Sequence, residues 1–341
     1  MIHSSAEIGA LVRKVMGIKE DQHLEIVPIA RGGSARLFYR VCAGKRAICV
    51  FMQYDRERRE NNFYAAQAEF LCEIGIAVPR IFHHNAAEGV IVMEDLGEYD
   101  LWHYRQAIWE IRRLYYFKTI DMIMKLHDLR RGEASWPNLP LMEAFGPELY
   151  RWEHEYFRQH FVQGICRIEL GVAESEALEG ELALLITDLT RMTVCLIHRD
   201  LQSQNVMICD DQPVLIDFQG MRYGHPCYDL GSLLYDPYVT FTEGEREELL
   251  QHYYSFCAKE YGLADFRVMF QRASVQRLMQ ALGAYGFLGR QQHQPGFLAH
   301  IPSALANLIT AVDDNPRFRL SRSLALRCQK ALAEKGTTSA H

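Results

Sequence analysis

The chain has 341 residues, a formal net charge of −6, and a composition of 49% hydrophobic and 23% charged residues. This length is sufficient for two lobes with their own cores, and the composition is typical of a folded globular protein. The acidic balance argues against a broad nucleic-acid surface, which would need an excess of Lys and Arg. The nine cysteines are scattered and form no C-x-x-C pair, which indicates free thiols in a reducing compartment.

The N-terminal stretch, MIHSSAEIGALVRKVMGIKEDQ, has no apolar run of the length that a signal peptide needs. We also expect no later segment to approach the roughly 18 apolar residues of a membrane span. These patterns predict a cytoplasmic protein without a membrane partner.

Residues 1–96 are expected to form a small β-rich lobe. Three strand-like runs, LEIVPIA, RLFYRV and RAICVFM, follow one another from Leu24 to Met52 and are separated by glycine-containing turns. A helical period covers residues 57–74, and two further strands are predicted at residues 78–82 and 89–93.

Residues 97–341 are expected to form a mostly helical lobe. Helical patterns are predicted at about residues 104–129, 144–161, 174–191 and 243–334. A short β-rich insert at residues 194–218 interrupts them and carries polar side chains at its strand ends. The two parts together predict an α+β fold, and catalytic groups are expected in the insert because strand ends and loops commonly hold them.

The insert reads His198-Arg199-Asp200-Leu201-Gln202-Ser203-Gln204-Asn205, with Asp217-Phe218 further along the chain. This pattern resembles the catalytic core of enzymes with the two-lobed protein-kinase-like fold. A carboxylate such as Asp200 would orient and deprotonate the attacking hydroxyl. Oxygens of Asn205 and Asp217, brought together by a hairpin, would suit Mg²⁺ bound to the phosphates of ATP or GTP. The alternative is that these residues only cap turns and end a strand.

Two further segments of the small lobe resemble nucleotide-binding parts of such kinases. Gly32, Gly33 and Ser34 lie between two predicted strands, where backbone N–H groups would approach phosphates, although a hairpin turn explains them as well. The main chain from Glu94 to Leu96 resembles the hinge that binds adenine, but it could equally be a plain linker.

One departure from the kinase pattern concerns the lysine expected in the third strand, because RAICVFM contains none. Arg36 or Lys45 is the candidate replacement, and Glu60 is its candidate acidic partner. The missing lysine also leaves open a catalytically silent nucleotide-binding regulator.

Only a short segment separates Gln219 from the apolar helix expected near Cys227, and no A-P-E tripeptide follows. A protein kinase needs a longer activation segment there. The chain therefore resembles the aminoglycoside-phosphotransferase-like small-molecule kinases. SARLFYRV, GIAVP and DFQ are most similar to its sugar-kinase branch, which acts on the anomeric hydroxyl of N-acetylmuramate or N-acetylglucosamine. In this family Asp229 would brace the catalytic loop.

The resemblance implies transfer of the γ-phosphoryl group from ATP, with Mg²⁺, to a hydroxyl of a small molecule such as an amino sugar. An aminoglycoside or a choline-like metabolite is the alternative acceptor. An aminoglycoside site should be strongly acidic, and a choline site should combine aromatic and acidic residues. Glu243, Glu245, Glu247 and Glu248 form an acidic run, but a solvated helix face accounts for them more simply.

Overall fold

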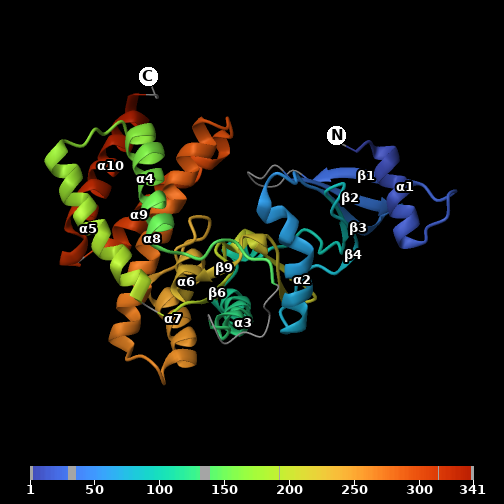
Figure 1. Ribbon diagram of the computed structural model, residues 1–341, viewed down its shortest axis with the longest axis horizontal. Coiled ribbons are helices and arrows are strands. Elements are labelled where there is room, and N and C mark those ends of the chain that lie inside the picture. The colour runs from blue at the N-terminus through green and yellow to red at the C-terminus, as the bar shows by residue number, and fades with distance from the viewer. Residues whose placement is uncertain (1–2, 30–35, 131–138, 192, 314, 339–341) are drawn as a thin grey trace.

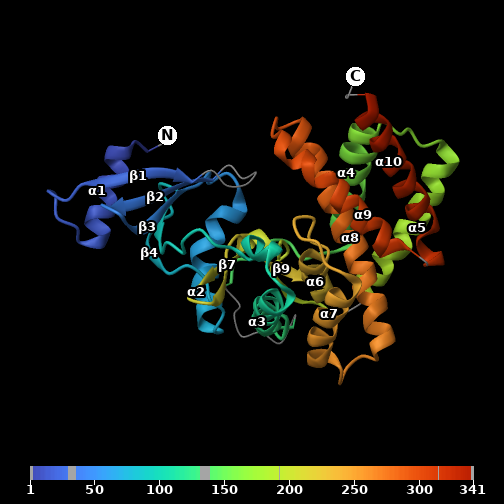
Figure 2. The ribbon, with the colours of Figure 1, turned by 180° about the vertical axis from the view of Figure 1, so that it is seen from behind.

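The computed structural model describes residues 3–29, 36–130, 139–191, 193–313 and 315–338, with the backbone alone from residue 335 onward. The β-rich part and the helical part lie at opposite ends of the molecule, and the short strands of the insert lie between them (Figures 1 and 2). The α+β architecture with two lobes agrees with the prediction from sequence.

A five-stranded antiparallel sheet forms the β-rich part, in the order β1-β2-β3-β5-β4. Its strands are β1 (Leu24–Ile29), β2 (Leu37–Ala43), β3 (Arg46–Gln53), β4 (Ile81–Asn85) and β5 (Val90–Met93). All five were predicted, although β4 begins later than expected. Helix α2 (Tyr64–Glu73) also agrees with the prediction, but the turn before it, η1 (Arg59–Phe63), is a 3₁₀ helix.

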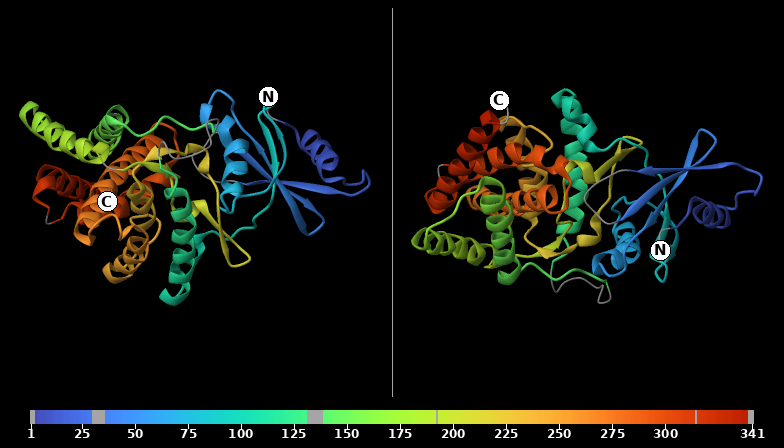
Figure 3. Two further views of the ribbon diagram at one scale, coloured as in Figure 1. Left: turned by 60° about the horizontal axis from the view of Figure 1, so that its bottom comes forward. Right: turned by 90° about the horizontal axis from the view of Figure 1, so that it is seen from above.

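Each face of this sheet is covered by one helix (Figure 3). Side chains of a strand alternate between its faces, so Phe51 packs in a core with helix α1 (Ser5–Met16), whereas Met52 packs in the core shared with α2. Burial on both faces explains the uninterrupted apolar run of β3. Helix α1 was not predicted from the sequence, although Ser4 and Glu7 form a capping box at its start.

The second part is mostly helical, as predicted. Its α-helices are α3 (Trp109–His127), α4 (Pro147–Phe157), α5 (Val172–Arg191), α6 (Pro226–Leu234), α7 (Glu243–Cys257), α8 (Leu263–Arg290), α9 (Ile301–Val312) and α10 (Arg319–Thr338). Shorter helical segments are η2 (Leu101–Gln106), the π-helical η3 (Arg158–Cys166), η4 (Ser203–Asn205), η5 (Phe218–Gly220), η6 (Pro295–His300) and η7 (Pro316–Phe318). The long helix α8 packs against α4, α6 and α9 and forms the centre of this part.

The predicted insert forms two small antiparallel sheets. Strand β6 (Cys195–Ile197) pairs with β9 (Arg222–Gly224), and β7 (Val206–Cys209) pairs with β8 (Gln212–Leu215). The loop from β6 to β7 carries the H-R-D motif, and the residues after β8 carry Asp217. The pairing of β7 with β8 therefore brings these two segments together.

Among the described residues, the helical stretch Pro295–Val312 is apolar and long enough to cross a membrane, with a mean hydropathy of 1.3 over 18 residues. The expectation that no segment approaches such a span is therefore wrong for this stretch. It joins η6 to α9, and one face of α9, including Ile301, Leu305 and Leu308, is buried against neighbouring helices. Packing in the core of the helical part accounts for the apolar residues on this face, although only 33% of the whole stretch is buried.

Candidate active site

A buried carboxylate holds the backbone of the H-R-D loop. Both oxygens of Asp229 accept hydrogen bonds from main-chain N–H groups, from His198 at 2.6 Å and from Arg199 at 2.7 Å. Nε2 of His127 lies 3.1 Å from the same carboxylate, and its Nδ1 lies 2.9 Å from the hydroxyl of Tyr253. Asp229 lies in the first turn of α6, where the helix dipole favours a negative charge. These bonds agree with the brace expected of Asp229.

Asp200 follows directly in this loop and lies between two arginines. Nη1 of Arg199 is 3.0 Å from one carboxylate oxygen, and Nη2 of Arg277 on α8 is 3.4 Å from the other. Burial alone would raise the pKa of Asp200, but the charges of these arginines outweigh it and lower the pKa. Asp200 is therefore ionised at neutral pH, with 26% of its side chain exposed.

The Asn205 side chain lies next to Asp200 and has a free oxygen. Its Nδ2 donates to the main-chain carbonyl of Asp200 at 2.8 Å, and the main-chain carbonyl of Asn205 accepts from the N–H of Ile216 at 3.0 Å. Among the described residues, nothing donates a hydrogen bond to its Oδ1. That oxygen therefore remains available for a ligand.

Asp217 also keeps one oxygen free. Its backbone is left-handed, with φ of 62°, and its Oδ1 accepts from Arg36 and, at 2.9 Å, from Nε2 of Gln219. Burial would raise the pKa of Asp217, but the charge and hydrogen bond of Arg36 outweigh it and lower the pKa to about 2. Within the described ranges, no donor contacts Oδ2 of Asp217.

These free oxygens fit Mg²⁺ rather than a metal held entirely by protein. The described part of the chain has no cluster of three or more His, Cys, Asp or Glu side chains that could hold a metal. Mg²⁺ typically uses one or two protein oxygens and takes the remaining ligands from phosphates and water. Oδ1 of Asn205 and Oδ2 of Asp217 match this requirement.

Arg36 is the cation that the structure places at this centre. It lies immediately before β2, and only 9% of its side chain is exposed. Lys45, the other candidate, is exposed in the turn after β2, at the opposite end of that strand. Glu60 lies in η1, where its charge raises the pKa of Arg36, although burial and Asp217 affect this pKa more.

The proposed hinge is held by an arginine that the sequence reading did not single out. Arg40 on β2 makes two bonds to the Asp95 carboxylate, at 2.6 and 3.1 Å, and one to the Gly97 carbonyl at 2.8 Å. The N–H of Glu94 is bonded to the Arg80 carbonyl, and no described residue pairs with the N–H of Leu96. The expected phosphate loop, Gly32, Gly33 and Ser34, lies outside the described residues.

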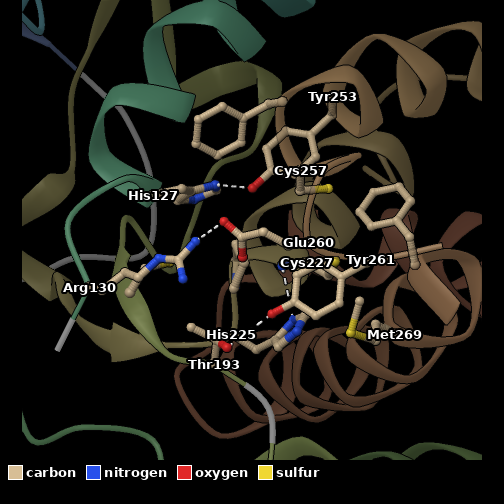
Figure 4. A pocket seen from close by; sticks show the side chains of 14 residues that line it. His127, Arg130, Thr193, His225, Cys227, Tyr253, Cys257, Glu260, Tyr261 and Met269 are labelled. Carbon is tan, nitrogen blue, oxygen red and sulfur yellow. Dashed lines mark hydrogen bonds and ion pairs between the residues drawn. The ribbon is translucent and has the colours of Figure 1, made fainter. Parts of the chain in front are cut away.

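A small cavity adjoins the Asp229 brace and is separate from the reactive carboxylates (Figure 4). Its lining includes His127, His225, Cys227 and Tyr253, and its volume is about 40 Å³. That space suits one or two water molecules and is too small for a sugar or a nucleotide. The cavity therefore belongs to the support of the catalytic loop.

The sequence profile of the Phosphotransferase enzyme family (APH) matches residues 25–266, which include every element described around Asp200 except α8 beyond its first residues. The chain belongs to this family. It is accordingly a small-molecule kinase, as the H-R-D motif and the short segment after Gln219 indicated. Residues 267–341 lie outside the match, and Arg277 is among them.

Relatives of this phosphotransferase include sugar kinases. The N-acetylmuramate/N-acetylglucosamine kinase of Pseudomonas aeruginosa is 24% identical over 316 residues, which cover 86% of either chain. A methylthioribose kinase of Yersinia pestis is 24% identical over 198 residues, or 54% of this chain and 47% of that one.

Solved structures confirm the fold of the phosphotransferase. A choline/ethanolamine kinase family protein from Mesorhizobium loti superposes with a TM-score of 0.62 at 15% identity, over 96% of this chain and 99% of that one. An ADP-bound aminoglycoside phosphotransferase, APH(2'')-Ib, gives a TM-score of 0.60 at 14% identity, over 91% and 99% of the two chains. These likenesses establish the kinase-like fold and leave the acceptor open.

Proposed function

We propose that this enzyme transfers the γ-phosphoryl group of ATP to the anomeric hydroxyl of an amino sugar, N-acetylmuramate or N-acetylglucosamine. The proposal also places the lobe boundary between residues 96 and 97 and the enzyme in the cytoplasm. It rests on the chemistry of the Asp200 centre and on the sugar kinase that is similar over 86% of the chain.

The residues around Asp200 would divide the work of phosphoryl transfer. Asp200, held ionised, orients the sugar hydroxyl and takes its proton as the new bond forms. Asn205 and Asp217 hold Mg²⁺, which when bound neutralises the phosphate oxygens. Arg36 supplies the positive charge that a strand lysine gives in protein kinases, so the missing lysine does not require a silent protein.

The proposed hinge has main-chain groups that can bind the adenine of ATP. The carbonyl of Glu94 can accept a hydrogen bond from the adenine amino group, and the N–H of Leu96 can donate to a ring nitrogen. Guanine carries an oxygen in place of that amino group and a protonated ring nitrogen, so it presents the opposite pattern. The phosphate loop of Gly32, Gly33 and Ser34 would supply backbone N–H groups to the phosphates.

The positive charge next to Asp200 is the observation that best supports the proposed class of acceptor. Two guanidinium groups, Arg199 and Arg277, lie within 3.4 Å of this carboxylate. A polycationic aminoglycoside or a choline-like cation would meet both of them where its hydroxyl has to bind. A neutral or anionic sugar meets no such repulsion.

The acidic run on α7 does not offer a substitute site for a cation. Glu245 caps its own helix through Thr242, Glu247 pairs with Arg267, and Glu248 pairs with Arg113 at 2.7 Å. These carboxylates already have partners within the fold, which favours the simpler interpretation of a solvated helix face.

An ATP-consumption screen over N-acetylmuramate, N-acetylglucosamine, neutral sugars, an aminoglycoside and choline would test this proposal. We expect turnover with the amino sugars alone, and ³¹P NMR should show a phosphate ester whose phosphorus couples to the anomeric proton. Turnover with choline or the aminoglycoside would refute the acceptor class. Nucleotide binding without transfer to any acceptor would favour the silent regulator.

A further inference from the structure

We propose that Arg277, together with Gln280, forms a subsite that recognises a carboxylate on the acceptor sugar and so favours N-acetylmuramate over N-acetylglucosamine. This inference rests on the proposed function and adds a specificity determinant to it. The two residues lie on α8, beyond residues 25–266 that the family profile matches.

Arg277 is a buried cation whose contacts leave it suited to a second anion. Its Nε donates to Oγ of Ser232 at 3.1 Å and its Nη1 to Oε1 of Gln280 at 2.5 Å. Both of these partners are neutral. The carboxylate that Arg277 contacts, Asp200, lies 3.4 Å away, a long distance for an ionic hydrogen bond. Asp200 is bound more closely, at 3.0 Å, by Arg199.

Burying such a cation costs free energy, and a role in binding would explain why the fold retains it. Only 5% of the Arg277 side chain is exposed, and a well-packed apolar side chain would commonly stabilise the same position as well or better. Arg199 lies closer to Asp200, so Arg277 is not the main ionic partner of this carboxylate. Burial raises the pKa of two nearby carboxyl groups, Asp236 and Glu153, and the charge of Arg277 lowers it by a smaller amount. A carboxylate arriving with the substrate would give Arg277 a directly bonded anionic partner.

The neighbourhood of Arg277 is suited to a sugar. Tyr285 lies two turns further along α8, and its hydroxyl is 3.5 Å from Nε2 of Gln202 in the catalytic loop. Its ring is near those of Tyr238 and His300, with centroid distances of 6.4 and 6.0 Å. Tyr285 is itself buried, whereas Tyr238 and His300 are half-buried, so their rings can offer apolar faces to sugar C–H groups. Hydroxyl and amide groups nearby can bind sugar hydroxyls.

The two candidate sugars differ in a group that Arg277 can detect. N-acetylmuramate carries a lactyl ether on the oxygen of C3, and this ether ends in a carboxylate. N-acetylglucosamine has a free hydroxyl there. With the anomeric hydroxyl at Asp200, the flexible ether of the same ring can bring its carboxylate to the adjacent guanidinium, which presents several donors in one plane.

Steady-state kinetics with both sugars would test the subsite in the full-length protein. Arg277→Gln also removes a contact to Asp200, so turnover of both sugars should fall by a shared factor. The ratio of kcat/KM for N-acetylmuramate to that for N-acetylglucosamine isolates the carboxylate. We expect this ratio to fall by roughly 10- to 100-fold, the scale of one charge-assisted hydrogen-bonded contact.

Two controls separate charge recognition from a structural effect. Arg272→Gln removes another arginine of α8, whose partner is Asp188 at 3.3 Å, and should leave the ratio unchanged. The amide of N-acetylmuramate keeps the shape of the lactyl group without its charge. Wild-type enzyme should prefer the acid strongly over this amide, and Arg277→Gln should largely lose that preference.

An unchanged ratio in Arg277→Gln, with equal losses for both sugars, would overturn the inference and assign Arg277 to Asp200 or to the transferred phosphoryl group. In that case the proposed function would still hold, because the wild-type enzyme would phosphorylate both sugars. If wild-type enzyme phosphorylated neither sugar, the proposed function would fail and the inference would fail with it.

Discussion

Arg36 and Asp217 form an ion pair although 181 residues separate them in the chain. The arginine precedes a strand of the β-rich lobe, and the aspartate follows the hairpin of the insert. The positive charge of Arg36 keeps the Asp217 carboxylate ionised and oriented before nucleotide binds. We expect the same guanidinium to contact the phosphates when ATP binds, since their charge exceeds that of one carboxylate.

Arg36→Met should therefore weaken the binding of Mg·ATP by roughly 10- to 100-fold, because a charge-assisted contact to phosphate is lost. Calorimetric titration with a non-hydrolysable ATP analogue and Mg²⁺ would measure this change. Lys45→Met is the matched control and should bind normally, since Lys45 is exposed at the other end of β2. Equal losses in the two variants would show that Arg36 does not replace the strand lysine.

Asp200→Asn should reduce kcat by roughly 10²–10⁴-fold, because the amide cannot accept the proton of the sugar hydroxyl. The affinity for Mg·ATP should change little, since Asn205 and Asp217 keep their free oxygens. Rapid-quench measurement of the chemical step, combined with nucleotide titration, would separate the two effects. Near-normal turnover would remove Asp200 from its assigned role.

Gln219→Leu should raise the concentration of Mg²⁺ needed for half-maximal activity several-fold. The variant loses the hydrogen bond to Oδ1 of Asp217, which helps to lower the pKa of that carboxyl group and to orient it. The buried Oε1 of Gln219 has no partner among the described residues, so it is also available to a metal-bound water. Activity measured against free Mg²⁺ at saturating ATP would check this expectation, and an unchanged requirement would contradict it.

Asp229→Asn should destabilise the fold by about 2–4 kcal/mol, because an amide group cannot accept both main-chain hydrogen bonds from His198 and Arg199. Urea denaturation followed by circular dichroism would measure the free energy of unfolding. Asp121→Asn, which alters an exposed contact with His252 at 2.7 Å, should change stability by well under ~1 kcal/mol. A stable Asp229→Asn variant would show that the loop does not depend on this brace.

The acid limb of the kcat/KM profile should reflect Asp200, whose pKa lies below its ordinary value of 3.8. Because Arg277 favours the ionised carboxylate, Arg277→Gln should raise the pKa of Asp200 and move the acid limb to higher pH. More of the base would then be protonated at a given mildly acidic pH, and activity would fall earlier as pH decreases. Arg272→Gln should leave the limb in place, and a limb that stays fixed in Arg277→Gln would exclude this electrostatic coupling.

Local patterns in the chain were sufficient to predict the strands of the β-rich lobe and the helical character of the remainder. They also predicted that Asp200, Asn205 and Asp217 lie close together. The reason is that these features depend on residues near one another in sequence. The hairpin of β7 and β8 sets the distance between Asn205 and Asp217. The hydrophobic periodicity that predicts a strand or a helix depends only on the residues of that element.

Tertiary structure alone decided which distant charges join that cluster. Nothing in the spacing of the chain indicates that Arg277 on α8 contacts Asp200, that Arg40 holds Asp95, or that Arg36 rather than Lys45 pairs with Asp217. Such pairs depend on how helices and sheets pack, and packing is set by buried surfaces summed over the whole fold. The kind of chemistry is therefore encoded locally. The charges around Asp200 come together only when α8 packs against the catalytic loop, and those around Asp217 only when the two lobes assemble.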